Sequence, residues 1–371
     1  MKILFFLFLI NFVFSLPRFS IETGTSCMNC HVNPTGGGMR NDYGSNIYAL
    51  EELTLKRLIK NADDMWDGYI TDNFQIGGDF RIQLFDDGDD SRIFPMQSDF
   101  YGNLKLTKNT DLYFKVDSSP YRNNEFFILF KNVIDKIWIK LGKTLPAYGL
   151  KLDDHTSFIR GGNRTSITEN SMDEGLFFDP LETGNPISIE TGFKINRNLH
   201  FNLSLANGFI SSNENEMLNS ALSINYYKLF ENFSFMGGMS YMKEKDISSL
   251  GIFYGVSIKD FTFSFELDQA KNWIDYNDSE AMYWQIVYKP IQGLHLIGKF
   301  DSFDRHIEYS SGRINRLSAG FEIYPLNILE IKFQIRKHYE TGSDDGGSVY
   351  PDPDTIFDFN NEYLLQVHTW F

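Results

Sequence analysis

Cysteine, clusters of basic residues and long hydrophobic runs are all scarce in this chain of 371 residues. It contains 2 Cys, too few for a disulfide framework. Its 34 Lys and Arg stand against 49 Asp and Glu and form no cluster, so a nucleic-acid-binding surface is excluded. After the first fifteen residues there is no run of about 18 apolar residues, which excludes a membrane protein built from spanning helices.

Aromatic residues, in contrast, are abundant. The chain has 35 Phe, 19 Tyr and 5 Trp, together 16 % of all residues, and it also has 29 Gly. Aromatic side chains favour the pleated surface of a β-sheet. This composition predicts a β-rich protein.

The first fifteen residues have the pattern of a secretory signal peptide. Lys2 precedes an apolar stretch that begins at Ile3, and Val13 and Ser15 stand at the −3 and −1 positions of a cleavage site. We expect residues 1–15 to be removed and the mature chain to begin at Leu16. The alternative is a buried N-terminal strand or helix.

Both cysteines belong to one motif, Cys27-Met28-Asn29-Cys30-His31. In the C-x-x-C-H spacing two thiols can add to the two vinyl groups of a haem, and the adjacent imidazole becomes the proximal iron ligand. A thioredoxin-like redox pair is the alternative, but it requires a helix directly after the motif, and Asn33-Pro34-Thr35-Gly36-Gly37-Gly38 predicts a loop. We therefore predict one covalent haem c, bound by Cys27, Cys30 and His31.

Residues 16–66 are expected to form the haem segment. Apolar positions between Ile47 and Ile59 predict one short amphipathic helix. About fifty residues are too few for a comfortable free-standing core, so we expect this segment to pack against something larger. The three glycines at 36–38 either allow close approach of the backbone to a porphyrin or form a flexible loop.

Residues 67–371 repeat a strand pattern. Leu329, Ile331, Phe333 and Ile335 alternate with charged or polar residues, and similar runs occur near 112–116, 137–141, 199–205, 261–267 and 317–323. Alternation over about ten residues with a charged second face is typical of a transmembrane antiparallel β-barrel with a polar lumen, whereas the strands of a soluble sandwich are shorter. We predict an all-β outer-membrane barrel of about 16 strands between Phe74 and Phe371, plugged by the haem segment.

Strand ends and loops carry further expectations. Tyr226, Tyr227, Tyr324, Tyr339 and Trp370 are expected in the aromatic girdles of the barrel. The acidic loops at 86–90, 213–216 and 342–354 are either solvated connections or sites that gather Fe²⁺ or Ca²⁺. The final strand ends on Phe371, which resembles the assembly signal of outer-membrane barrels.

The signal peptide, the single C-x-x-C-H motif and the barrel together resemble the fused monohaem cytochrome c-porin family, which includes outer-membrane iron oxidases. The segment from Cys27 through Met39-Arg40 to Tyr43-Gly44 looks like the family's haem segment. The resemblance implies an outer-membrane electron conduit, with a periplasmic cytochrome or other carrier on one side and an extracellular donor or acceptor, such as Fe²⁺, on the other. Gly142 to Gly149 with Asp153 to Thr156 also resembles a stretch of porin-like chains, without an assigned role.

Several alternatives stay open at this point. Met39 and His155 are the first candidates for a sixth iron ligand, and His200, His295, His338 and His368 are predicted to face the lumen. Whether the protein is an iron oxidoreductase or an electron carrier is open. A solute porin with a haem-bearing structural or redox-sensing plug is the rival function. No H-E-x-x-H or G-x-S-x-G motif suggests a hydrolase.

Overall fold

A computed structural model describes residues 17–55, 66–118, 124–152, 154, 156–161, 175–176, 186–208, 218–274, 277–308, 313–341 and 356–371. The predicted signal peptide, His155 and the acidic loops at 213–216 and 342–354 lie outside these residues. Within them, no helix is long and apolar enough to cross a bilayer.

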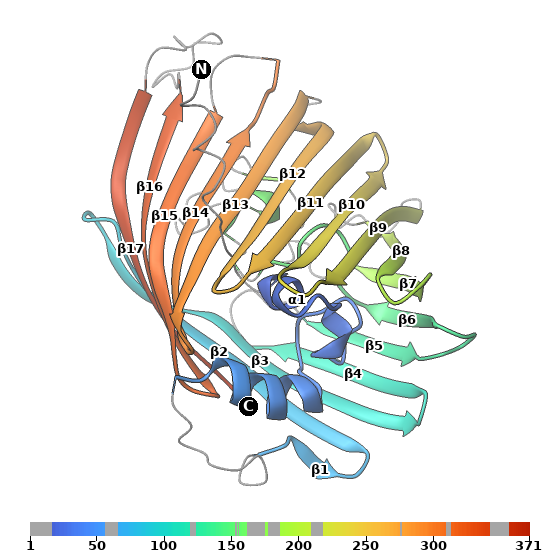
Figure 1. The fold of residues 1–371 in the computed structure, drawn as a ribbon. Helices are drawn as coiled ribbons and strands as arrows, with labels where there is room; N and C mark the ends of the chain where they lie inside the picture. Colours follow the sequence, from blue (N-terminus) through green and yellow to red (C-terminus); the bar gives the residue numbers. More distant parts are fainter. Residues whose placement is uncertain are drawn as a thin grey trace.

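Sixteen antiparallel strands, among the described residues, form a closed barrel (Figure 1), which confirms the predicted fold class. Each strand pairs with the next, and β17 pairs with β2 to close the barrel, with Leu365 opposite Leu84. A short strand, β1 (Tyr69–Thr71), pairs with β2 outside this cycle. The barrel strands are β2 (Phe74–Asp86), β3 (Ser91–Thr107), β4 (Thr110–Asp117), β5 (Glu125–Phe130), β6 (Ile137–Lys143), β7 (Ile187–Lys194), β8 (Leu199–Asn207), β9 (Leu218–Leu229), β10 (Ser234–Glu244), β11 (Ile247–Ile258), β12 (Phe261–Ile274), β13 (Asn277–Ile291), β14 (Leu294–Asp304), β15 (Arg313–Leu326), β16 (Leu329–Thr341) and β17 (Ile356–Trp370).

The two ends of the barrel differ in their connections. At one end, which we call the short-turn end, lie the turns that follow the odd-numbered strands from β3 to β15. Each of these turns has two to six residues. The opposite end, the long-loop end, carries all the longer connections, including residues 144–186 between β6 and β7. Outer-membrane barrels place short turns toward the periplasm and long loops toward the outside.

The strands are apolar on the outside and polar on the inside. In β16, Ile335 is 41 % exposed, whereas its neighbours Gln334 and Arg336 are 2 % and 3 % exposed. A water-soluble protein would show the opposite arrangement. The outer surface therefore suits a hydrocarbon environment, and the polar faces meet inside the barrel.

Aromatic side chains do lie on the outer surface near the strand ends, but only some of them are the residues that the sequence predicted. Tyr226 faces outward, at 37 % exposed, but Tyr227, Tyr324 and Trp370 are buried inside. Other aromatics take their place near the short-turn end, where Phe230 and Phe233 stack at 4.4 Å between ring centroids. Adjacent residues of a strand point to opposite faces, so a girdle member cannot be chosen from proximity to a strand end alone.

The N-terminal segment lies inside the barrel (Figure 1), in its short-turn half. It contains α1 (Pro17–Thr23), η1 (Cys27–Asn29) and η2 (Tyr43–Leu53). Ile21 of α1 is fully buried against a cluster that includes Phe253 and Val287 of the wall. The predicted amphipathic helix corresponds only in part to η2, which ends at Leu53 because Thr54 is extended, and residues 56–59 of the prediction lie outside the described residues. Leu50 and Leu53 are buried, although Ile47 is 52 % exposed.

A buried ion pair holds α1 against the wall. Arg18 is 1 % exposed and lies 2.8 Å from the Glu322 carboxylate, and it also donates a hydrogen bond of 2.7 Å to the Tyr324 hydroxyl. A buried guanidinium is tolerated only when it is paired and hydrogen-bonded. The N-terminal segment is thus fixed to the wall by charge as well as by apolar packing.

The β6–β7 connection sends a second segment into the lumen, which we call the second insert (described residues 144–152, 154 and 156–161). Its short helix η4 (Phe158–Arg160) packs against β12, β13 and β14, and Phe158 and Ile159 are fully buried. Asp154 lies 2.7 Å from Lys299 and 3.2 Å from Arg336 of the wall. Part of the sequence that had no assigned role therefore crosses the long-loop half of the lumen.

Candidate functional site

The Cys27–His31 motif is folded so that its two thiols lie on the same side of the chain. Residues Cys27–Asn29 form a turn of 3₁₀-helix, in which the amides of Cys30 and His31 both donate to the Cys27 carbonyl oxygen, at 3.1 and 3.0 Å. Side chains three residues apart eclipse in a 3₁₀-helix. Both cysteines are free thiols.

The imidazole of His31 is oriented by the backbone. Its Nδ1 lies 3.3 Å from the Gly38 carbonyl oxygen, which assigns the proton to Nδ1 and leaves the Nε2 lone pair available. Burial, together with the nearby charge of Arg40, lowers the pKa of His31 to about 4. The ring is therefore neutral at pH 7, as a metal ligand must be.

The three glycines after the motif are required by geometry rather than by flexibility. Gly36, Gly37 and Gly38 all have positive φ, at 88°, 75° and 64°. A Cβ on Gly36 would lie 2.8 Å from the Cβ of Cys27, and one on Gly38 would lie 2.3 Å from the Tyr113 hydroxyl oxygen. The loop is wound tightly between the first thiol and the barrel wall.

Asn41 ties the motif together, a role that sequence reasoning missed. Its amide nitrogen donates to the Cys30 carbonyl oxygen at 2.9 Å, and its side-chain Nδ2 donates to the Asn29 carbonyl oxygen at 3.0 Å. Its Oδ1 accepts from the Gly44 amide at 3.0 Å. Nothing in the sequence around Asn41, ten residues after His31, indicates that it would hold the motif.

Two lysines from the rest of the chain, of which Lys140 is buried and Lys151 partly buried, clamp the loop that follows the motif. Lys140 of β6 donates to Asn33 Oδ1 at 3.1 Å and lies 2.7 Å from Glu190. Lys151 of the second insert donates to the Gly36 carbonyl oxygen at 2.6 Å. Sequence reasoning found neither, because both lie more than a hundred residues from the motif.

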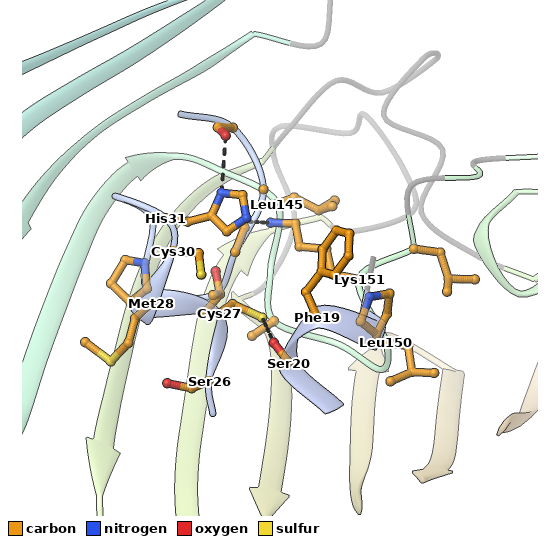
Figure 2. A pocket seen from close by; sticks show the side chains of 18 of the residues that line it. Phe19, Ser20, Ser26, Cys27, Met28, Cys30, His31, Leu145, Leu150 and Lys151 are labelled. Atoms are coloured by element: carbon orange, nitrogen blue, oxygen red, sulfur yellow. Dashed lines mark hydrogen bonds between the residues drawn. The ribbon is translucent and has the colours of Figure 1, made fainter. Parts of the chain in front are cut away.

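A cavity with about 2730 Å³ of space not filled by atoms, part of it open to solvent, adjoins the motif. Figure 2 shows Cys27, Cys30 and His31 on one side of it, with Lys151 and Leu150 of the second insert facing them. The cavity thus lies between the N-terminal segment and the second insert.

The candidate sixth ligands lie in different places. Met39 is 4 % exposed and packs in a cluster with Tyr101, Tyr113 and Trp138, rather than among the residues that line the cavity. His200 does line the cavity, as do the methionines Met28, Met96 and Met236. A sixth ligand stays a prediction, and His155 lies outside the described residues.

The other lumen histidines are buried partners of carboxylates. His368 bonds Glu330 through Nδ1 at 2.8 Å and Asp79 through Nε2 at 2.5 Å. His338 lies 3.2 Å from Glu362, and His295 lies 3.8 Å from Glu322. All three face the lumen as predicted, and their contacts are those of wall residues.

Metal capture by the acidic loops finds no support in the described residues, which contain no group of three His, Cys, Asp or Glu side chains that could hold a metal ion. In the loop after β2, Asp86 and Asp87 instead accept hydrogen bonds from the amides of Gly88, Asp89 and Asp90, at 2.8 to 3.0 Å. This loop is a self-bonded turn.

The residues present fit a c-type haem. Two free thiols, a neutral imidazole with one nitrogen already bonded to the backbone and an adjoining cavity satisfy its covalent and axial requirements. The glycines bring the backbone loop against Cys27 without a side chain in the way.

Comparison with known proteins concerns the barrel. No family model and no curated protein sequence matches the chain. A solved porin structure aligns with a TM-score of 0.52 at 12 % identity and covers 80 % of this chain and 100 % of the porin. The outer-membrane channel DcaP of Acinetobacter baumannii aligns with a TM-score of 0.53 at 10 % identity, over 82 % of this chain and 99 % of DcaP.

OprB of Pseudomonas putida, at high pH, aligns with a TM-score of 0.54 at 8 % identity, over 81 % of this chain and 94 % of OprB. At such low identities the likeness establishes the fold alone. The chain has the β-barrel fold of outer-membrane porins.

Proposed function

We propose that this chain is an outer-membrane protein in which a porin-type barrel encloses one covalently attached haem c. The observation that carries the proposal is that Cys27, Cys30 and His31 line one cavity inside the barrel. Cys27 and Cys30 would form the two thioether bonds, and His31 would ligate the iron through Nε2. The bound group would supply one-electron redox chemistry.

The barrel surface supports the location in the outer membrane. Its outward faces are apolar, its inward faces are charged, and its longer connections all lie at one end. Export would follow from the signal peptide predicted at residues 1–15. We propose on this basis that the short-turn end faces the periplasm.

Passage of a solute is the function that the comparisons favour, because the similar structures are described as a porin and an outer-membrane channel. The charged lumen supports it as well. In this function the N-terminal segment would be a structural or redox-sensing plug. The fused cytochrome-porin resemblance supports the second candidate, an electron conduit.

The filled lumen favours that second candidate. The second insert crosses the barrel and buries Phe158 and Ile159 completely, while Asp154 forms ion pairs with two wall cations. A lumen narrowed by packed apolar and paired charged groups passes solutes poorly. The electron conduit would connect an extracellular donor or acceptor, with Fe²⁺ as one candidate, to a periplasmic cytochrome.

Reconstitution in liposomes separates the two functions. If solutes pass, proteoliposomes will swell in an isotonic sugar solution. If electrons pass, Fe²⁺ added outside will reduce a cytochrome enclosed inside without swelling. Failure of both would contradict both functions, and a protein that carries no covalent haem would contradict the proposal itself.

A further inference from the structure

The cavity that contains the Cys27–His31 motif reaches the short-turn end of the barrel. A second opening shares His31 and Pro34 with that cavity, and its lining also includes Asn132 and Lys136 of the β5–β6 turn. This turn is one of the hairpins of the short-turn end. The motif is therefore reached from that end.

On the side of β12–β14, the second insert closes the lumen toward the long-loop end. Tyr148, Phe158 and Ile159 form a buried cluster with wall residues such as Phe303. Ser157 donates to Asp301 at 2.6 Å, fixing the insert to β14. The second opening reaches the motif directly from the short-turn end, because His31 lines it.

Cations surround this opening although the chain has a net charge of −15. Its lining includes four lysines and two aspartates: Lys105, Lys131, Lys136, Lys194, Asp42 and Asp111. Lys131 pairs with Asp111, and Lys136, with a side chain 57 % exposed, lies 3.6 Å from Asp135. The lining therefore carries an excess of positive charge that the chain as a whole lacks.

Exposed apolar side chains stand beside these lysines. Val133 and Ile134 in the β5–β6 turn are 49 % and 68 % exposed, and Ile195 in the β7–β8 turn is 53 % exposed. Apolar residues next to a charged rim are characteristic of surfaces that bind other proteins, whereas a small anion would need only the cations.

We propose that the short-turn end around this opening is the docking surface for a small electron-carrier protein with an acidic face. This inference rests on the proposed haem at Cys27 and Cys30. One electron would pass between the docked carrier and the haem iron, so that one is oxidised as the other is reduced. We call the surface, defined by Lys131, Val133, Ile134, Lys136 and Lys194, the lysine rim.

The test uses the full-length holoprotein in detergent and two reductants. Pre-reduced flavodoxin serves as a small acidic one-electron donor, and hexaammineruthenium(II) serves as a small cation that reports whether the haem can be reduced at all. We expect flavodoxin to reduce the haem at a rate that falls steeply with ionic strength, and Lys131→Glu/Lys136→Glu to lower the low-salt rate by about tenfold or more.

A matched variant, Lys228→Glu/Lys259→Glu, makes the same charge change at the same end, at the end of β9 before the β9–β10 turn (Lys228) and in the β11–β12 turn (Lys259), and neither residue lines the opening. It should retain the wild-type rate within about twofold. Lys136→Glu alone, at an exposed position, keeps the test valid if the Lys131 change impairs folding.

The outcomes separate this inference from the proposed function. If hexaammineruthenium(II) reduces the haem of every variant but the flavodoxin rate depends neither on salt nor on the lysine rim, only the docking surface is overturned. A colourless protein would overturn the proposed function and the docking surface with it.

Discussion

Lys151 Nζ donates a hydrogen bond of 2.6 Å to the Gly36 carbonyl oxygen and thereby joins the two segments that occupy the lumen. The residues are 115 positions apart in the sequence. Lys151 comes from the second insert, and Gly36 follows the C-x-x-C-H motif. The insert that crosses the barrel therefore also holds the loop of the proposed haem site.

Replacing Lys151 with Met should loosen this loop. A hydrogen bond to a charged group contributes about 1.5–3 kcal/mol, so amide hydrogen exchange at Gly36, whose N–H donates to Asn33, should accelerate by about tenfold or more. Mass-spectrometric exchange of peptides covering residues 32–40 measures this. Lys151→Arg should exchange nearly as slowly as the wild type, and equal exchange in all three proteins would show that the contact is dispensable.

Gly36→Ala should reduce haem attachment. Its Cβ would lie 2.8 Å from the Cβ of Cys27, and its φ of 88° already disfavours a side chain. Gly88→Ala is the matched control, since Gly88 has a φ of 90° but has nothing within 4 Å of the added Cβ. The haem-to-protein absorbance ratio should fall severalfold only in Gly36→Ala. Equal ratios in the two variants would refute the crowding argument.

Arg18→Met should detach α1 from the wall, because it leaves the Glu322 carboxylate buried without its closest cation. Breaking one side of a buried pair costs about 3–5 kcal/mol. Limited proteolysis within residues 17–55 during a denaturant titration would detect the loss. Lys289→Met removes the pair with Glu22, at 2.8 Å, whose lysine side chain is 29 % exposed, and should cost about 1 kcal/mol or less. A similar loss in both variants would contradict this account of α1.

Asp154→Asn should release the second insert and increase ion conductance. Lys299 and Arg336 would then lose a charged partner that lies 2.7 and 3.2 Å away. Single-channel recordings in planar bilayers should show a nearly closed wild-type barrel and frequent openings of the variant. Asp89→Asn, in an exposed loop, provides a control with the same loss of charge. A wild-type protein with a large, steady conductance would favour the solute porin instead.

The sequence predicted the barrel because its signal is local. Alternation in stretches such as 329–335 fixes which side chains share a face, and sixteen such strands close into a barrel. The girdle was assigned less well, because Tyr226 and Tyr227 are neighbours that face opposite sides. Position near a strand end does not determine the face.

The site was predictable only where chemistry fixes the spacing. Cys27, Cys30 and His31 follow from one motif, whereas Lys140 and Lys151 reach the same loop through tertiary structure from distant segments. The location of Met39 in the wall cluster was also not predictable, since closeness in sequence to His31 does not determine which way a side chain points.

The visible absorption spectrum of the reduced protein, after denaturing electrophoresis, tests the central claim most directly. The protein would be produced in a host able to attach haem c, beside a Cys27→Ala/Cys30→Ala variant. We expect a haem band that stays with the wild-type polypeptide under denaturing conditions and is absent from the variant. A wild-type polypeptide without bound haem, in a host that loads other c-type cytochromes, would contradict the account.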